Sequence, residues 1–330
     1  MPLPTKPIAS VSLDLDDKWT YMKTHGDPNW SDFPSYLNIV VPRVLQFLEQ
    51  RNMRITFFIV GQDAALERNH AVLRSIANAG HEISNHSFHH EPWLHLYSEE
   101  DIRKEFQAAE DAIVSATGQL PRGFRGPGFS LSESVIKVMI SRGYQYDAST
   151  LPTFLGPLAR AYYFFNAKLD PEEKKKRAKL FGTLADGLKP IKVYNWKSVA
   201  GSMTEIPVTT VPVVRTPFHL SYLIYLHGFS HLLSAAYMNI AFSSCKMAGV
   251  NPSFLLHPLD FLGRDEAPEL GFFPGMKMSA EEKLRLAHKT FDALAERFTL
   301  VQMKDHASGS ALARDVKSDT VPDRAPTLPR

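Results

Sequence analysis

Two histidines four residues apart, His86 and His90, stand in the run E-I-S-N-H-S-F-H-H at residues 82–90. Imidazole rings at this spacing can converge on one cation in a tight loop after a strand, and neutral imidazole is the commonest protein ligand for zinc. A catalytic site normally keeps three protein ligands and leaves one position for water. The sequence therefore predicts a metal site at 86–90 whose third ligand, a carboxylate, comes from elsewhere.

A strand-like segment near the amino terminus supplies candidate acids. Residues 8–16 alternate apolar and polar side chains, which places Asp14 and Asp16 on the same face of a strand. Helical spacing follows at 36–50, and the succession of a strand and a helix then recurs as far as 149. Strands that alternate with helices of this length indicate βα units, so the sequence predicts an α/β fold with a parallel sheet, either a barrel or a doubly wound sheet.

The carboxyl ends of the predicted strands carry a coherent set of polar residues. In a parallel α/β barrel the active site lies at these ends. The residues found there are Asp14, Asp16, Asp17, His86, His89, His90, Arg125, Asp147 and His257. A carboxylate with two histidines is a complete ligand set for one catalytic divalent ion, with zinc preferred and iron, cobalt or nickel also compatible.

Such an ion lowers the pKa of bound water from about 15.7 to about 7, so hydrolysis is the predicted reaction. A second carboxylate beside the metal can take the proton of the water, and a histidine on the far side can protonate a leaving amine. Asp14 and His257 fit these two positions.

Composition limits the class of protein. The chain has 330 residues, of which 44% are hydrophobic and 22% charged, and a formal net charge of +2. These values fit one barrel-sized globular domain and give no indication of nucleic-acid binding. The single cysteine, Cys245, excludes an internal disulfide framework. Residues 1–7 lack the apolar core of a secretory signal, which favours a cytoplasmic location.

Three regions interrupt the regular pattern. Residues 151–200 contain four prolines, aromatic pairs and a basic run at 174–179, and we interpret them as a helical insertion. Residues 218–248 are predicted to form one long apolar helix, whose His, Ser and Asn residues argue against a membrane span. After residue 305 the composition shifts to Ser, Ala, Asp, Arg and Pro, so 306–330 is predicted to be a disordered tail behind a single domain at 1–305.

Six motifs in chain order together resemble those of the polysaccharide deacetylases, the NodB-homology group also known as carbohydrate esterase family 4. They are L-D-L-D-D at 13–17, T-F-F-I-V-G at 56–61, N-H-S-F-H-H at 85–90, F-R-G-P-G-F at 124–129, Y-D-A-S at 146–149 and L-L-H-P at 255–258. The resemblance covers roughly residues 8–149 and 203–301. It implies a distorted (β/α)7-8 barrel with a helical insertion, one divalent metal ion and removal of an N-acyl group from an amino sugar.

The resemblance also implies roles for individual residues. His86 and His90 would be metal ligands, Arg125 would orient the base, Asp147 would tune a partner and His257 would be the general acid. The common form of the family has adjacent aspartates, which would make Asp16 the base and Asp17 the ligand. A branch with cytoplasmic members carries D-x-D, which would make Asp14 the base and Asp16 the ligand. We prefer the second register, because strand alternation points Asp14 and Asp16 to the same side and Lys18 stands where the first form usually has glycine.

The substrate is defined less sharply. Trp19, Phe129 and Glu205 are candidates for substrate contacts. An N-acetyl or N-formyl amino sugar is implied by the resemblance, and the basic insertion together with the apolar helix favours a lipid-linked substrate and peripheral contact with the inner membrane face. The alternatives are a non-catalytic sugar-binding barrel and a metal-dependent glycosyltransferase, for which Asp14-Leu15-Asp16 would be the D-x-D motif. The oligomeric state stays open.

Overall fold

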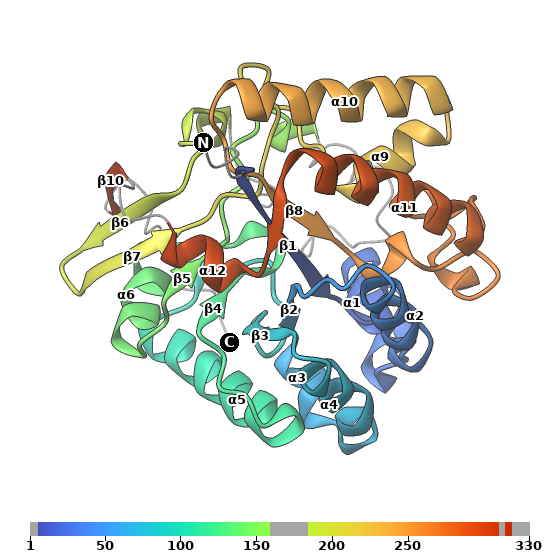
Figure 1. Cartoon of the computed structure of the whole chain (residues 1–330). Coiled ribbons are helices and arrows are strands. Elements are labelled where there is room, and N and C mark those ends of the chain that lie inside the picture. Colours follow the sequence, from blue (N-terminus) through green and yellow to red (C-terminus); the bar gives the residue numbers. More distant parts are fainter. Residues whose placement is uncertain (1–5, 159–183, 310–313, 319–330) are drawn as a thin grey trace.

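The computed structural model describes residues 6–158, 184–309 and 314–318, and its centre is a curved, mostly parallel sheet (Figure 1). The strand order is β10-β6-β7-β5-β4-β3-β2-β1-β8, and β9 also pairs with β1. The strands are β1 (Ile8–Leu15), β2 (Thr56–Ile59), β3 (Glu82–Asn85), β4 (Gly123–Phe124), β5 (Tyr146–Asp147), β6 (Tyr194–Ser198), β7 (Gly201–Glu205), β8 (Ser253–Leu256), β9 (Thr299–Val301) and β10 (Arg314–Lys317). The predicted α/β class with a parallel sheet is confirmed.

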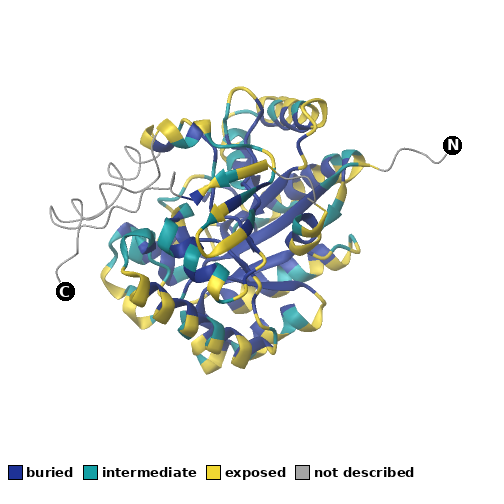
Figure 2. Ribbon diagram, turned by 90° about the vertical axis from the view of Figure 1, so that its left-hand side faces the viewer, coloured by how far each residue is buried: buried dark blue, intermediate teal, exposed yellow. Residues whose placement is uncertain are grey.

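Helices cover the outer face of this sheet (Figure 1). They are α1 (Lys18–His25), α2 (Leu37–Glu49), α3 (Gly61–Ala65), α4 (His70–Asn78), α5 (Glu99–Thr117), α6 (Glu133–Ser141), α9 (Leu220–His227), α10 (His231–Met247), α11 (Ala280–Arg297) and α12 (Met303–Ser308). Short 3-10 turns include η4 (Pro127–Phe129) and η7 (Pro258–Asp260), which both follow strand ends. Figure 2 shows the central strands buried, with exposed residues on the outer helices and on strands at the edge of the sheet such as β7 and β10.

The sheet closes into a distorted barrel through the segment that follows β7. The Val208 N–H donates to the Thr150 carbonyl at 2.8 Å on one side, and the Thr209 N–H donates to the Ser253 carbonyl at 3.2 Å on the other. This irregular segment therefore joins the β5 side to β8. Strand β6 runs antiparallel to β7, β10 pairs parallel with β6, and both lie outside the closed ring.

Strand β1 explains why the barrel interior can carry a polar site. Its apolar residues Ala9, Val11, Leu13 and Leu15 belong to the main hydrophobic core. The alternate positions Ser10, Ser12 and Asp14 are buried as well, so they face the interior of the barrel. A strand buried on both faces is typical of a parallel sheet covered by helices. The polar residues in the predicted alternation therefore face the enclosed interior and not solvent.

The structure differs from the predicted insertion and helix. Residues 194–198 form strand β6, because Tyr194 and Trp196 alternate with Asn195 and Lys197 and bury their rings. The predicted basic helix at 174–179 lies outside the described residues. Residues 218–248 form two helices, α9 and α10, with a break at Gly228. A new helix starts after Ser230, whose hydroxyl accepts from the Leu233 N–H. Among the described helices, none has the length and apolar character that crossing a bilayer requires.

The predicted disordered tail also needs correction where it is described. His306 lies in α12, is fully buried, and its Nδ1 is 2.7 Å from the Ser10 hydroxyl of β1. Residues 314–317 form β10 and pair with β6. The compositional shift after residue 305 did not reveal these elements, because their packing partners lie about 300 and 120 residues away in the sequence.

Candidate metal centre and active site

The strand register brings the candidate site residues to one end of the barrel. Asp16, His86, Arg125 and His257 are each the first residue after a strand, namely β1, β3, β4 and β8. Leu15 pairs with Ile59 of β2, which pairs with Asn85 of β3, and Asn85 pairs with Phe124 of β4. On the other side of β1, Leu13 pairs with Leu256. The four residues therefore emerge from the sheet at nearly the same level.

Asp16, His86 and His90 form a cluster with metal-ligand geometry. Asp16 Oδ1 lies 3.3 Å from His86 Nε2 and 3.0 Å from His90 Nε2, and one ligand atom from each residue lies within 4.8 Å of the others. Two tetrahedral zinc ligands with bonds of about 2.0–2.1 Å lie about 3.3–3.4 Å apart. The described residues thus contain a buried His-His-Asp set whose donor atoms already converge. These three residues fit one divalent ion.

The loop after β3 is shaped to make His86 and His90 converge. Ser87 and His90 have positive φ angles of 62° and 54°, an uncommon conformation for residues other than glycine. The carboxylate of Glu105 on α5 holds the loop, because its Oε1 accepts from the N–H groups of Phe88 and His89 at 2.9 and 2.7 Å. His89 turns away from the cluster and pairs with the same carboxylate at 2.7 Å. Strained backbone supported in this way is common at functional sites.

A hydrogen bond on the side of the ring away from Asp16 fixes the orientation of His86. Its Nδ1 lies 2.6 Å from the carbonyl oxygen of Arg125, so Nδ1–H donates there and Nε2 is left for Asp16 and an ion. Burial lowers the pKa of His86, but the charges of Asp14 and Asp16 outweigh burial and raise it. For Asp16, burial alone raises the pKa, yet His90 and His86 bring it well below its usual range. Asp16 and His86 therefore shift each other's pKa in opposite directions, as close groups in a buried site do.

The two aspartates that follow β1 have different surroundings. Asp17 Oδ1 accepts from the backbone N–H groups of Lys18 and Tyr36 at 2.8 and 2.9 Å, which caps α1 and fixes the next loop. Burial raises the pKa of Asp17 to about 6. Asp16 Oδ1, by contrast, faces the two imidazoles. This geometry favours the register with Asp14 as base and Asp16 as ligand.

Asp14 and Arg125 form a buried ion pair beside the cluster. Arg125 Nη1 donates to Asp14 Oδ1 at 2.6 Å and to the Ser12 hydroxyl at 2.9 Å, and its Nε donates to the Ala148 carbonyl at 3.0 Å. The guanidinium also lies 4.3 Å from the ring centroid of Phe58. Arg125 is fully buried, so a carboxylate partner is needed to stabilise its charge. Arg125 therefore holds Asp14 in one orientation, as the predicted orienting role requires.

His257 lies on the other side of β1 and is partly exposed. Its Nδ1 is 3.2 Å from the Ser221 hydroxyl, and its backbone N–H donates to Asp260 Oδ2 at 2.9 Å. His219 lies beside it, with ring centroids 5.6 Å apart. Burial, followed by the charges of His257 and Arg125, brings the pKa of His219 well below its usual value, so its ring is neutral.

Asp147 and Glu205 are placed differently from the other predicted site residues. They are the last residues of β5 and β7, pair directly in the sheet and are fully buried. Glu205 accepts from the N–H and hydroxyl of Thr150 and from Trp196 Nε1, and Asp147 Oδ1 accepts from the Ser149 hydroxyl at 2.6 Å. Burial and the neighbouring Glu205 raise the pKa of Asp147 well above its usual range. The prediction that Glu205 contacts substrate is wrong, because its side chain has no exposed surface.

The two predicted aromatic contacts also differ from each other. Trp19 is 1% exposed and its Nε1 donates to Asp63 at 2.7 Å, so it forms a wall behind His90 and cannot stack on a sugar ring. Its predicted substrate contact is therefore corrected. Phe129 is partly exposed and has a positive φ of 62° in the turn η4 that follows Arg125. Phe129 is thus accessible at the barrel end, and its substrate contact stays a prediction.

Several residues at the site were not identified from the sequence. Glu105 supports the histidine loop, Ser221 and Asp260 contact His257, and Tyr21 lies beside Asp16. Burial, followed by the charge of Asp16, raises the pKa of Tyr21 well above its usual value. Asp260 could have been found, because a carboxylate three residues after a strand-end histidine in H-P-L-D matches the spacing of a capping box. Ser221 and Glu105 come from distant helices and carry no local signal.

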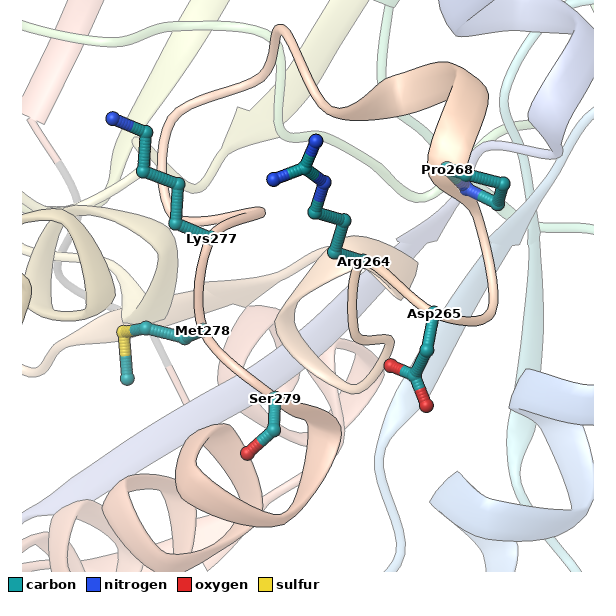
Figure 3. Close-up of a pocket in the computed structure, with 6 residues that line it drawn as sticks. All are labelled: Arg264, Asp265, Pro268, Lys277, Met278 and Ser279. Carbon is teal, nitrogen blue, oxygen red and sulfur yellow. The ribbon is translucent and has the colours of Figure 1, made fainter.

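Two cavities border the loop between β8 and α11. One has a volume of about 430 Å³ and is lined by Arg264, Asp265, Pro268, Lys277, Met278 and Ser279; Arg264 and Lys277 extend to the same side while Asp265 points away (Figure 3). The other, of about 510 Å³, is lined in part by Tyr225, Phe229 and Phe272. Neither is lined by the His-His-Asp cluster, so the candidate site rests on side-chain geometry and not on cavity size.

Known proteins with similar sequences point to the same chemistry. Residues 7–146 match the family model described as polysaccharide deacetylase. The chain is 32% identical over 96 residues to a peptidoglycan-N-acetylglucosamine deacetylase of Bacillus cereus, which is 29% of this chain and 34% of that protein. It is 31% identical over 111 residues to a peptidoglycan-N-acetylmuramic acid deacetylase of Bacillus subtilis, which is 33% of this chain and 41% of that protein. The chain thus spans only about a third to two fifths of these relatives.

The fold extends the likeness over the whole chain. A crystal structure of a Mycobacterium smegmatis protein assigned as a polysaccharide deacetylase superposes with a TM-score of 0.58, at 18% identity and with 99% of both chains covered. At that identity the likeness concerns the fold alone. The matched segment, by contrast, contains Asp14, Asp16, His86, His90 and Arg125. Residues 7–146 of this chain are thus similar to the polysaccharide deacetylase family.

Proposed function

We propose that this protein is a metal-dependent amide hydrolase that removes an N-acyl group, acetyl or formyl, from an amino sugar. The observation that carries the proposal is the convergence of Asp16, His86 and His90 beside the Asp14–Arg125 ion pair, with His257 on the next strand. Zinc is the preferred ion, because two imidazoles and one carboxylate are a common catalytic zinc set. The match of residues 7–146 to the polysaccharide deacetylase family model, and the action of the similar relatives on peptidoglycan amino sugars, support this substrate class.

The residues of the site divide the reaction between them. A zinc ion held by Asp16, His86 and His90 would supply an activated water and polarise the amide carbonyl. Asp14 Oδ1 is engaged by Arg125, so Oδ2 is the atom that accepts the proton of the attacking water. His257 Nδ1 is engaged by Ser221, so Nε2 faces the leaving nitrogen and protonates it. General base and general acid catalysis each contribute typically about 10²–10⁴-fold.

The test is release of free amine from N-acetylglucosamine oligomers, from N-acetylated peptidoglycan fragments and from N-formyl amino sugars, with zinc-loaded protein. We expect one zinc per chain and amine release that chelation abolishes and zinc restores. A sugar-binding barrel without catalysis would bind the oligomers and release no amine. A D-x-D glycosyltransferase would instead consume a nucleotide sugar and would not need His257. Either result would replace the proposal.

A second proposal concerns a lipid surface. Exposed apolar side chains gather on α9, α10 and the turns before and between them. Among them are Val213, Phe229, Leu232 and Met247, which are 90%, 71%, 83% and 82% exposed. The sequence from 206 to 259 contains no acidic residue, while Arg215 and Lys246 add positive charge. An apolar, acid-free surface suits the anionic inner face of a membrane, where a lipid-linked amino sugar would be presented.

Co-sedimentation with vesicles containing anionic lipids tests this surface. We expect the wild-type protein to bind and the double variant Phe229→Ser, Leu232→Ser to lose binding, while amine release from a small water-soluble substrate is retained. A second variant with Lys174, Lys175 and Lys176 changed to Glu tests the basic run, which lies outside the described residues. Binding that survives both sets of changes would refute the membrane contact and leave the hydrolase proposal untouched.

A further inference from the structure

We propose that Asp260, acting through Ser221, is the carboxylate that positions His257 and stabilises its protonated form. The inference rests on the proposed function, in which His257 is the general acid. It replaces Asp147, which the resemblance implied as the residue that tunes a partner. Asp260 and Ser221 are positioning residues, because they act on the substrate only through the imidazole of His257.

The contacts of Asp260 reach both ends of His257. Asp260 is 2% exposed; its Oδ2 accepts from the His257 backbone N–H at 2.9 Å, and its Oδ1 accepts from the Ser221 hydroxyl at 2.8 Å. The Ser221 oxygen in turn lies 3.2 Å from His257 Nδ1. The carboxylate therefore fixes the backbone of the histidine directly and reaches its ring through one hydroxyl.

This arrangement gives Nδ1 a partner in both protonation states. In the imidazolium, and in the neutral ring that is left when Nε2 gives its proton to the leaving nitrogen, Nδ1–H donates to the Ser221 oxygen, whose own proton is already donated to Asp260 Oδ1. In the neutral tautomer that carries its proton on Nε2, Nδ1 accepts from the Asp260 backbone N–H, which faces the ring in the capping box of η7. Nε2 therefore keeps its direction toward the site before and after it gives up its proton.

The other charged groups around His257 do not replace Asp260. His219 on α9 carries no charge, because burial holds its pKa well below the usual value. Arg125 engages Asp14, which lies on the neighbouring strand β1. Lys283 on α11 donates to the carbonyls of Leu259 and Leu262 and so clamps the turn that carries Asp260. Tyr21 lies near Asp260 and stays protonated, because burial raises its pKa. Asp260 is thus the carboxylate bonded to the histidine and its serine.

Asp147 offers a matched comparison. Its carboxyl bonds to Ser149 and lies against Glu205, and the Ser149 hydroxyl accepts from the Gly126 N–H at 2.8 Å. Burial and Glu205 raise the pKa of Asp147, and burial also raises the pKa of Asp260, so the contacts of the two carboxyl groups and not their pKa directions distinguish them. The contacts of Asp147 support the loop after β4 on the opposite side of Arg125. The contacts therefore show that Asp260, and not Asp147, reaches His257. The order of the motifs alone could not distinguish these two carboxyl groups.

The experiment compares Asp260→Asn with Asp147→Asn in the full-length, zinc-loaded protein. Ring titration of His257 is followed by NMR with labelled histidine, and kcat and KM for amine release are measured from about pH 5 to 10. We expect Asp260→Asn to move the titration of the His257 ring at least about one pH unit lower, to move the alkaline limb of kcat with it, and to lower kcat about 10–100-fold with KM within about twofold. Ser221→Ala should give a smaller shift in the same direction, and Asp260→Glu should restore part of the titration.

The control fixes the interpretation. Asp147→Asn should leave the titration of the His257 ring where it is, whatever it does to the stability of the barrel. A His257 ring that titrates alike in the wild-type protein and in Asp260→Asn, or that shifts only in Asp147→Asn, would overturn the proposal. If the wild-type protein releases no amine, the proposed function fails, whereas the NMR titration still decides whether Asp260 acts on His257.

Discussion

Two groups of buried acids lie at strand ends of the same barrel and have opposite character. Asp16 follows the last residue of β1 and faces two imidazoles with one oxygen, which together bring its pKa well below the usual range. Asp147 and Glu205 are the last residues of β5 and β7 and are still paired in the sheet, where burial and the neighbouring Glu205 raise the pKa of Asp147 well above its usual range. Asp16 thus lies one residue beyond its strand, where it can bind an ion. Asp147 and Glu205 still lie within their strands, where they stabilise the sheet.

The donors around each group show the same contrast. Glu205 accepts three hydrogen bonds from Thr150 and Trp196, which occupy its oxygens. Asp16 Oδ1 faces His86 Nε2 and His90 Nε2, both of which are metal-ligand atoms. A buried acid whose oxygens are occupied by hydrogen bonds from neighbouring donors is structural, whereas a buried acid whose oxygen faces two imidazole nitrogens can bind metal together with them. Burial alone does not distinguish the two groups.

The strongest way to break this comparison is to remove one imidazole. We expect His90→Ala to retain less than about a tenth of an equivalent of zinc and to lower the rate of amine release by about 10³-fold or more, since a metal contributes several kcal/mol to transition-state stabilisation. His89→Gln is the matched control, because His89 pairs with Glu105 and points away from the cluster. Metal analysis with a full equivalent of zinc in His90→Ala would refute the assignment.

Removal of Arg125 tests whether Asp14, the buried carboxylate beside the Asp16 cluster, is charged in the folded protein. Arg125→Met leaves the carboxylate of Asp14 buried without its partner, so we expect the free energy of unfolding to fall by about 3–5 kcal/mol. Arg125→Lys keeps the charge but cannot donate to Asp14, Ser12 and Ala148 in the same fork geometry. The stability of this variant should therefore lie between that of the wild type and that of Arg125→Met. Urea unfolding measures both variants. An Arg125→Met protein as stable as the wild type would show that Asp14 is not charged in the barrel.

The opposite end of β1 provides a pH test that involves no site residue. Burial lowers the pKa of His306 to about 4, below its value in an unfolded chain of about 6.5. The unfolded state therefore binds more protons between these values, and the contribution of neutral His306 is present above about pH 6.5 and lost as the pH falls toward 4. We expect a loss of up to about 3 kcal/mol over this window.

Unfolding of the wild type and of His306→Gln in parallel isolates that contribution. The difference in unfolding free energy between the two proteins should shrink as the pH falls from about 7 to 4. A difference that does not change with pH would mean that His306 is exposed to solvent, contrary to its position beside Ser10.

The smallest effect is expected at the structural pair. Glu205→Gln places an amide NH₂ group against donors from Thr150 and Trp196, so we expect stability to fall by about 1–3 kcal/mol. Zinc content and kcat should stay within about threefold of the wild type, because Glu205 has no exposed surface. Thermal unfolding combined with metal analysis checks both statements. Loss of zinc in Glu205→Gln would show that the Asp147–Glu205 pair supports metal binding, so that the two groups of acids would not differ in function.

The sequence was most informative where chemistry and local structure coincide. His86, His90, Arg125 and His257 were predicted at strand ends, and the structure brings them to one end of the barrel, because parallel strands in register end at the same level. The alternation in β1 also indicated that Asp14 and Asp16 share a side. The likeness of motifs added residue roles, which stay predictions until the experiments above are done.

The sequence was least informative where partners are distant. Strand β6 depends on its pairing with β7 and β10, and the buried position of His306 depends on its contact with β1. No local pattern reveals these partners. Trp19 was predicted to contact substrate because tryptophan often stacks on sugars. In the structure its Nε1 donates to Asp63 and its ring is buried. The role of Asp147 was predicted from the order of the motifs. In the structure Asp147 is the last residue of β5 and pairs with Glu205 of β7, so it lies against that residue.

The central place of β1 has a consequence for how the chain folds during synthesis. The residues Asp14, Asp16, His86, His90 and Arg125 all precede residue 126, whereas β8, the second neighbour of β1, begins roughly 240 residues after β1 ends. At about 5–20 residues per second, the ribosome needs about 10–50 s to make that stretch. Throughout this time one edge of β1 has no strand beside it, and the ligand set is complete from residue 90 onward. Zinc that binds the nascent chain would therefore tie β1 to β3 before His257 exists, and metal supply would influence folding yield as well as activity.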